Sequence, residues 1–81
     1  MKIPVEFYSY FKDITGCTQT EVEVSQNADV SVLMSEIYRH FPELLKMKQS
    51  TLVAVDMEYQ GPDHPLTPTD KVSLFPPVQG G

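Results

Sequence analysis

The spacing of apolar residues changes twice along this 81-residue chain, and this change limits its fold more than any other feature. Apolar and polar residues alternate near the N-terminus, follow a spacing of three and four in the middle, and alternate again towards the C-terminus. Alternation is typical of half-buried strands, whereas the spacing of three and four is typical of an amphipathic helix. A chain of this length buries one modest core, so these segments should share it in a single domain.

Four segments combine alternation or a short apolar run with β-branched and aromatic residues, and each predicts a strand. They are residues 1–11, 20–24, 51–55 and 71–75. The first two should pair as an antiparallel hairpin, because the polar segment between them contains Gly16 and predicts a turn. Residues 59–65 contain two prolines and one glycine and should form a turn-rich connection before the last strand.

A central helix is predicted from the middle pattern. Its apolar positions form one stripe: Val30, Leu33, Met34, Ile37, Tyr38 and Phe41. Asp29 or Ser31 can cap its start by accepting a hydrogen bond from an unpaired backbone N–H group. Pro42 should end it, because the residue before a proline disfavours the helical conformation. Residues 43–48 are expected to add one short helical turn.

This order of elements predicts an α+β fold with a mixed sheet packed on one main helix. A hairpin followed by a crossover helix and further strands is compatible with a β-grasp. The first and last strands would then lie side by side at the centre of the sheet, a pairing that periodicity alone leaves open. Residues 1–77 would form this domain, and residues 78–81 a flexible tail, because untethered chain ends are mobile.

The composition limits the partners and the compartment that we expect. The formal net charge is −5, which disfavours nucleic acid as a partner and suits proteins with basic grooves. The sequence shows neither a signal-peptide pattern nor an apolar run of membrane-spanning length. Its single cysteine, Cys17, cannot form an internal disulfide. We therefore expect a cytoplasmic protein that binds neither nucleic acid nor membranes.

The side chains offer few constellations for catalysis or metal binding. His40 and His64 lie far apart in sequence, and Cys17 has no neighbouring histidine or basic cluster that would lower its pKa. Asp56 and Glu58 would share a face if the preceding strand continued, but paired surface carboxylates are usually only solvated. His40 is expected to interact with the C-terminal dipole of the helix. No bound cofactor or metal is therefore expected.

The C-terminal segment LFPPVQGG stands apart from this ordinary background. Pro76 and Pro77 favour an extended path away from the last strand. Gly80 and Gly81 lack Cβ atoms, so their backbone can enter a channel too narrow for other residues. The terminal carboxylate could then be activated and exchanged for a nucleophile. A frayed chain end is the alternative, and the residues alone leave both interpretations open.

DHPLTPTDKVSLFPPVQGG, residues 63–81, closely resembles the C-terminal signature of the small, sulfur-carrier subunits of molybdopterin synthase. VEFYSYFKDITG at residues 5–16 is similar to the first strand and turn of that family, and LVAVD at residues 52–56 to its central strand. The resemblance covers almost the whole chain. The chain departs from the family pattern at three places: Asp56 in place of asparagine, Pro68–Thr69 in place of an acidic-glycine turn, and Lys71 in place of an acidic residue.

The resemblance implies a ubiquitin-like β-grasp fold and the role of a sulfur carrier. An E1-like activating enzyme would use ATP to adenylate the Gly81 carboxylate, and a sulfur donor would convert it to a thiocarboxylate. The tail would then enter the large catalytic subunit of molybdopterin synthase and donate sulfur to cyclic pyranopterin monophosphate, forming the molybdopterin dithiolene. The chain would be a carrier rather than an enzyme alone, and two small and two large subunits would form a heterotetramer.

The candidate site follows from the tail and the resemblance together. Its reacting group is Gly81, with Gly80 beside it. The residues expected to contact the partner lie in or next to the tail: Phe75, Pro76, Pro77, Val78 and Gln79.

Phe75 is the expected aromatic anchor at the base of the tail. Val72 and Leu74 share one parity in the last strand, whereas Lys71 and Ser73 share the other parity with Phe75. Lys71 and Ser73 are polar, so their side of the strand should face solvent, which favours Phe75 as an interface residue. The alternative is that Phe75 ends the core.

Two other functions remain open from the sequence. A thiamine-pathway sulfur carrier shares the fold and the Gly-Gly end, but is typically shorter and lacks the FPPV neck. A ubiquitin-like modifier would form isopeptide bonds with lysines of target proteins. A neighbouring gene for a large synthase subunit would separate these functions from that of a molybdopterin synthase carrier.

Overall fold

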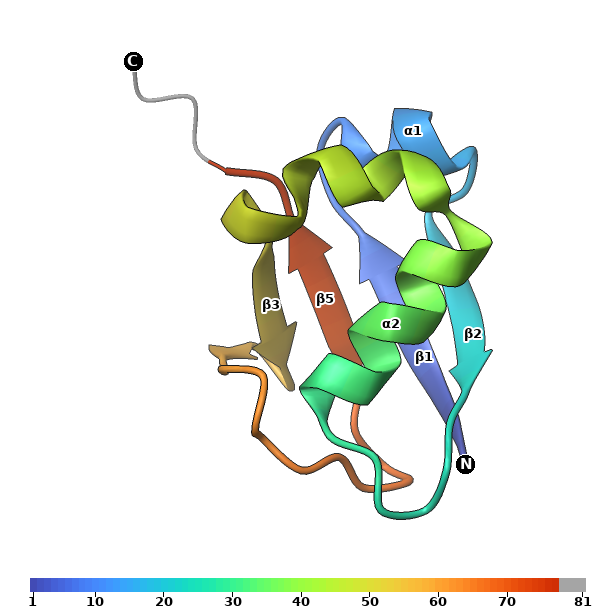
Figure 1. The fold of residues 1–81 in the computed structure, drawn as a ribbon, viewed down its shortest axis with the longest axis vertical. Coiled ribbons are helices and arrows are strands. Elements are labelled where there is room, and N and C mark those ends of the chain that lie inside the picture. Colours follow the sequence, from blue (N-terminus) through green and yellow to red (C-terminus); the bar gives the residue numbers. More distant parts are fainter. Residues whose placement is uncertain (78–81) are drawn as a thin grey trace.

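Five strands and one long helix form a two-layer α+β fold, shown in Figure 1. The structure is a computed structural model that describes residues 1–77. The elements in chain order are β1 (Lys2–Phe7), α1 (Phe11–Thr15), β2 (Gln19–Glu23), α2 (Val30–His40), the 3₁₀-helix η1 (Pro42–Ser50), β3 (Leu52–Val55), β4 (Glu58–Tyr59) and β5 (Val72–Phe75). The α+β class with one main helix is confirmed.

The sheet is mixed, with the strand order β2-β1-β5-β3-β4. The N-terminal hairpin β1–β2 is antiparallel, as are β3–β4 and β3–β5. Strands β1 and β5 are parallel neighbours, with Val5 opposite Val72 and Phe7 opposite Leu74. The first and last strands therefore lie side by side at the centre of the sheet, as expected for a β-grasp.

Helix α2 crosses one face of this sheet and buries its apolar stripe against it (Figure 1). Val30, Leu33, Met34 and Ile37 are buried, and the ring of Phe41 meets the ring of Phe7 edge to face at 5.3 Å. The stripe matches the 3.6-residue period of a helix, so a single face supplies the whole contact.

Of the two candidate N-cap residues of α2, Asp29 and Ser31, the structure shows Asp29 in that position. Asp29 is the N-cap, and its side chain accepts a hydrogen bond from the Val32 N–H at 3.0 Å. Ser31 does not cap the helix but donates its hydroxyl to Asp29 at 2.6 Å. This hydrogen bond is the main reason that the pKa of Asp29 lies below its ordinary value. The helix ends at His40, two residues before Pro42, as the proline predicts.

Three elements differ from the sequence expectation. The first strand stops at Phe7 rather than at residue 11, because Ser9 has φ = 56° and breaks the extended backbone. Part of the expected turn is the short helix α1, which Gly16 ends in a left-handed conformation with φ = 77°. Residues 42–50 form more than the one expected turn, as two 3₁₀ segments that meet at a kink at Met47, where φ is −114°. The expected loop after β3 contains the two-residue strand β4.

The β3–β4 hairpin explains the departure at Asp56. Its two turn residues, Asp56 and Met57, have φ = 50° and 73°, and two-residue hairpin turns favour asparagine or aspartate at such positive-φ positions. The Asp56 N–H donates to the Lys71 carbonyl at 2.8 Å, and its carboxylate accepts from the Lys71 N–H at 3.0 Å. The strand ends at Val55, so the shared strand face considered for Asp56 and Glu58 does not exist.

The departure at Pro68–Thr69 also lies in an intact turn. The Thr67 N–H donates to the Asp70 carboxylate at 2.8 Å, and the Asp70 N–H donates to the Thr67 carbonyl at 3.1 Å. Proline suits the second position of such a turn because its φ is already set near the required value. Both departures therefore preserve the backbone path into β5.

We expect Leu33→Ala to lower the free energy of unfolding by about 2–5 kcal/mol, the usual range for truncating a buried leucine. Leu33 is fully buried in the layer between α2 and the sheet. Chemical denaturation measures the change, and Val32→Ala is the control, because the neighbouring Val32 side chain is exposed. Equal losses for the two variants would contradict this description of the core.

Met57→Gly should raise the free energy of unfolding by about 0.5–1 kcal/mol. A left-handed conformation costs a residue with a Cβ about 1–2 kcal/mol, which glycine avoids. Glycine also gives the unfolded chain more conformational freedom, and this offsets about 0.4–1 kcal/mol of the stabilisation. Met57→Ala is the matched control, since it removes the exposed side chain but keeps the Cβ. A gain of the same size from alanine would show that the side chain, not the backbone, is responsible.

Candidate functional site

An aromatic patch lies on the open face of the sheet, the face turned away from α2. The ring of Phe75 stacks on that of Tyr8, with centroids 4.5 Å apart and an angle of 23° between the planes. The ring of Tyr59 meets Phe75 edge to face at 6.1 Å. Leu52 lies opposite Phe75 in the register of β3 and β5. We call Tyr8, Leu52, Tyr59 and Phe75 the aromatic patch.

Strand pairing brings these residues together from four separate segments. The Tyr8 N–H donates to the Leu74 carbonyl at 3.1 Å, which continues the β1–β5 pairing by one residue and places Tyr8 beside Phe75. Tyr59 lies opposite Ala54 in the β3–β4 hairpin, on the same face. Tyr59 and Leu52 are 67% and 37% exposed. The patch therefore offers an accessible apolar surface to a partner.

The alternation of side chains along β5 places Phe75 on the predicted face, but the predicted solvent exposure of Ser73 is wrong. Val72 and Leu74 are buried in the core, and the half-buried Phe75 faces the opposite side with Lys71. Ser73 was expected to face solvent, yet it is only 1% exposed. The reason is that β5 is a central strand, so this small side chain lies between Glu6 of β1 and Ala54 of β3.

A polar network borders the patch on the open face. The Lys71 Nζ lies 2.7 Å from the Glu6 Oε1, and the Tyr8 hydroxyl donates to the same oxygen at 3.2 Å. The hydrogen bond from Lys71 is the main reason that the pKa of Glu6 lies below its ordinary value, and Glu6 in turn raises the pKa of Lys71. An exposed pair of this kind contributes little to stability. Its geometric effect is to connect Tyr8 to the start of β5.

The candidate tail begins at the edge of this patch. Pro76 and Pro77 are half-buried and follow Phe75 directly, so three of the expected partner-contacting residues lie together. Val78, Gln79, Gly80 and Gly81 lie outside the described residues, as does the expected flexible tail.

Sequence reasoning missed Tyr8 and Tyr59. The sequence did contain an indication for Tyr8: it is an aromatic residue that continues the alternating positions of Lys2 and Glu6, which face away from the core. Tyr59 carried none, since it lies in a two-residue strand within an apparent loop.

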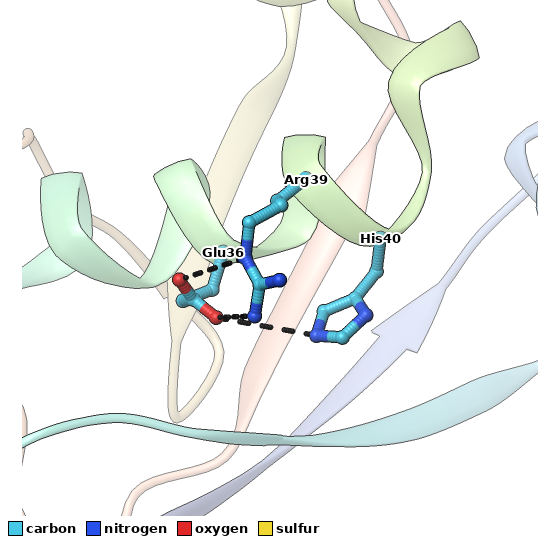
Figure 2. Close-up of polar contacts among 3 residues, drawn as sticks. All are labelled: Glu36, Arg39 and His40. Atoms are coloured by element: carbon cyan, nitrogen blue, oxygen red, sulfur yellow. Dashed lines mark hydrogen bonds and ion pairs between the residues drawn. The ribbon is translucent and has the colours of Figure 1, made fainter.

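A second group of titratable side chains lies close together on the surface of α2 (Figure 2). The Arg39 guanidinium contacts Glu36 at 2.8 Å, and the His40 Nε2 lies 4.0 Å from the same carboxylate. The hydrogen bond from Arg39 is the main reason that the pKa of Glu36 is lowered. All three residues come from one helix at spacings of three and four, which is the ordinary geometry of helix-surface pairs. His40 lies in the last turn of α2, where the helix dipole favours a cation.

Cys17 also lies away from the patch. Its side chain is half-buried, with the sulfur 3.7 Å from the Thr15 hydroxyl. Within residues 1–77, no group of three His, Cys, Asp or Glu side chains is placed to hold a metal ion. In the same part of the chain, no helix is long and apolar enough to cross a membrane.

Known proteins share this fold and this sequence pattern. The chain is 25% identical to the molybdopterin synthase sulfur carrier subunit of Chlamydomonas reinhardtii, with 100% of both chains aligned. The crystal structure of SAMP1 from Haloferax volcanii matches with a TM-score of 0.87 at 19% identity over 100% of both chains. A chain from the complex of subunits 1 and 2 of molybdopterin-converting factor from Helicobacter pylori matches with a TM-score of 0.73 at 23% identity, again over 100% of both chains.

These two structural likenesses establish the fold, which is a ubiquitin-like β-grasp. The family follows from the sequence, because the profile of the ThiS family matches residues 5–81, almost the whole chain. The described domain and the candidate tail are thus covered by one family match, and the chain belongs to the ThiS family.

Proposed function

We propose that this chain is the sulfur carrier subunit of molybdopterin synthase and that Gly81 carries the sulfur as a thiocarboxylate. The observation that supports it most directly is the aromatic patch at the base of the FPPVQGG segment. The sequence similarity to the Chlamydomonas carrier subunit supports the same function.

The patch suits the first step, which is docking on a large subunit. Interface energy is concentrated in a few aromatic or aliphatic anchors surrounded by a polar rim. Phe75 is such an anchor, and the Glu6–Lys71 pair supplies part of the rim. The H. pylori structure is a complex of subunits 1 and 2, which supports a partner of this kind. We propose a heterotetramer of two small and two large subunits in the cytoplasm.

The position of the patch also defines where the reacting group can act. Phe75 is followed by Pro76 and Pro77, whose fixed φ values favour an extended path. Four residues follow Pro77, and four extended residues span at most about 14 Å. A partner that holds the patch would therefore receive the Gly81 carboxylate within roughly this distance of Pro77.

The chemistry at Gly81 proceeds in two stages under this proposal. In an E1-like enzyme, the carboxylate attacks the α-phosphorus of ATP and pyrophosphate leaves; sulfide-level sulfur from a donor then attacks the acyl carbon and displaces AMP, forming the thiocarboxylate. In the large subunit, the thiocarboxylate sulfur bonds to a carbon of cyclic pyranopterin monophosphate and displaces an oxygen leaving group there. Water then cleaves the acyl–sulfur bond, which leaves the sulfur on the pterin and restores the Gly81 carboxylate. The small subunit contributes a carried atom and a docking surface, while its partners supply the catalytic side chains.

We expect Phe75→Ala to weaken binding to the large subunit from the same organism by at least about 2 kcal/mol, a typical hot-spot loss. Losing the stacking of Phe75 on Tyr8 should lower the free energy of unfolding of the domain by only about 0.5–1.5 kcal/mol. Titration calorimetry and thermal melts measure the two effects. Leu74→Val is the control, because Leu74 is buried on the opposite face of β5; it should lower stability by about 1 kcal/mol without changing affinity. Unchanged affinity for Phe75→Ala would return Phe75 to a purely structural role.

Sulfur loading at Gly81 is the direct test of the function. Incubation with the activating enzyme, ATP and a sulfur donor should replace one carboxylate oxygen with sulfur, as seen by intact mass. Gly80→Ala should slow loading because it adds a Cβ inside the channel. Gly61→Ala is the matched control, since a Cβ at Gly61 meets no atom within 4 Å.

Three outcomes would contradict the proposal. The first is pterin sulfuration by a variant that is extended beyond Gly81 and is not processed. The second is an adenylated chain that forms isopeptide bonds with lysines and never supports pterin sulfuration, which would identify a protein modifier. The third is loading without transfer to the pterin, together with sulfur delivery in thiamine synthesis, which would identify a thiamine-type carrier.

A further inference from the structure

A groove of about 410 Å³ lies between α2 and the β3 edge of the sheet. It exists because β4 pairs with β3 at only two positions. The Gln60 N–H still donates to the Val53 carbonyl at 3.0 Å, but the chain then leaves the sheet, and Pro62 accepts a hydrogen bond from the Ser31 N–H of α2. The first part of β3 pairs with β5 on one side, and on its other side it borders this groove instead of a strand.

The groove is lined by a mainly apolar surface together with several hydroxyl groups and a lysine. Met34 of α2 and Val53 of β3 contribute apolar surface, and Ser35 and Tyr38 contribute hydroxyl groups. Burial raises the pKa of Tyr38, so its hydroxyl stays neutral. Among the described residues that line the groove, Lys48 is the only charged one, although the chain has eleven aspartates and glutamates. On an acidic protein, this groove is thus a site that favours an apolar group accompanied by a carboxylate.

The groove is continuous with the aromatic patch. Leu52 and Tyr59 line the groove and also belong to the patch. A protein that covers Phe75 and Tyr8 therefore reaches the mouth of the groove at the β3–β4 edge.

We propose that the groove receives an extended segment of the same large subunit that covers the aromatic patch. Apolar side chains of this segment lie over Met34 and Val53, and an aspartate or glutamate contacts Lys48. The inference rests on the proposed function, because it gives the same partner a second contact. Holding the domain from both sides of the β3–β4 edge would fix its rotation on the partner and so the direction in which the tail starts.

The test compares two lysines of η1 in the complex with the large subunit from the same organism. Lys48 lines the groove, whereas Lys46 is exposed and does not. Lys48→Glu and Lys46→Glu change the net charge equally, so long-range steering is affected equally. Titration calorimetry should show an increase in Kd of about 10-fold or more for Lys48→Glu, as expected for breaking a charge pair, and at most about 2-fold for Lys46→Glu.

A second pair of variants tests occupancy of the groove without changing charge. Ser35→Trp fills the groove from α2, and Ser25→Trp places the same side chain on the exposed loop after β2. Only Ser35→Trp should weaken binding, by about 10-fold or more, and thermal melts should confirm that both variants fold. In the wild-type complex, hydrogen exchange of groove amides such as those of Ser35 and Gln60, which are already hydrogen-bonded in the free chain, should become slower than in the free chain.

Several outcomes would overturn the inference. Equal effects of the two lysine variants, with hydrogen exchange of the groove amides as fast in the complex as in the free chain, would show that the groove stays empty. Phe75→Ala would still weaken binding in that case, so the proposed function would survive. A change in self-association of the isolated chain by Ser35→Trp, with unchanged affinity for the large subunit, would assign the groove to a second copy of this chain. Failure of the wild-type chain to bind the large subunit would overturn both proposals.

Discussion

The parallel pairing of β1 with β5 is the interaction on which the rest of the structure depends. It joins the two ends of the chain at the centre of the sheet, with Val5 opposite Val72 and Phe7 opposite Leu74. The inner side chains of both strands then form the surface that α2 covers. The same register places Tyr8 against Phe75 on the other face. One pairing therefore creates both the core and the base of the candidate tail site.

The β3–β4 hairpin determines what surrounds this site. Its tight turn is held by two hydrogen bonds between Asp56 and Lys71, which attach the hairpin to the start of β5. Lys71 then pairs with Glu6 on the open face. Tyr59 reaches the patch because it pairs with Ala54, and because β4 is so short, the first part of β3 pairs with β5 but has no β4 partner on its outer edge. The aromatic patch and the groove are thus two sides of one short sheet edge.

Local patterns in the sequence predicted the elements well where a long period or a strong cap was present. The α2 stripe and the cap at Asp29 are examples, because each depends on residues within one or two helical turns. The short elements α1 and β4 were not predicted, because segments of five and two residues are too short to show a periodic pattern of apolar residues. Ser73 was misplaced because parity gives the side of a strand, whereas its exposure depends on the neighbouring strands.

The sequence by itself determined the helix, the alternating strands, the side of β5 on which Phe75 lies and the resemblance of the tail to sulfur carriers. These are properties of consecutive residues, for which the spacing alone sets the direction of each side chain. Only the tertiary structure decided that Tyr8, Leu52 and Tyr59 meet Phe75 and that a groove opens beside them. Strand order and register bring these residues together from segments up to 67 positions apart (from Tyr8 to Phe75, 75 − 8), and no local pattern encodes contacts over such separations.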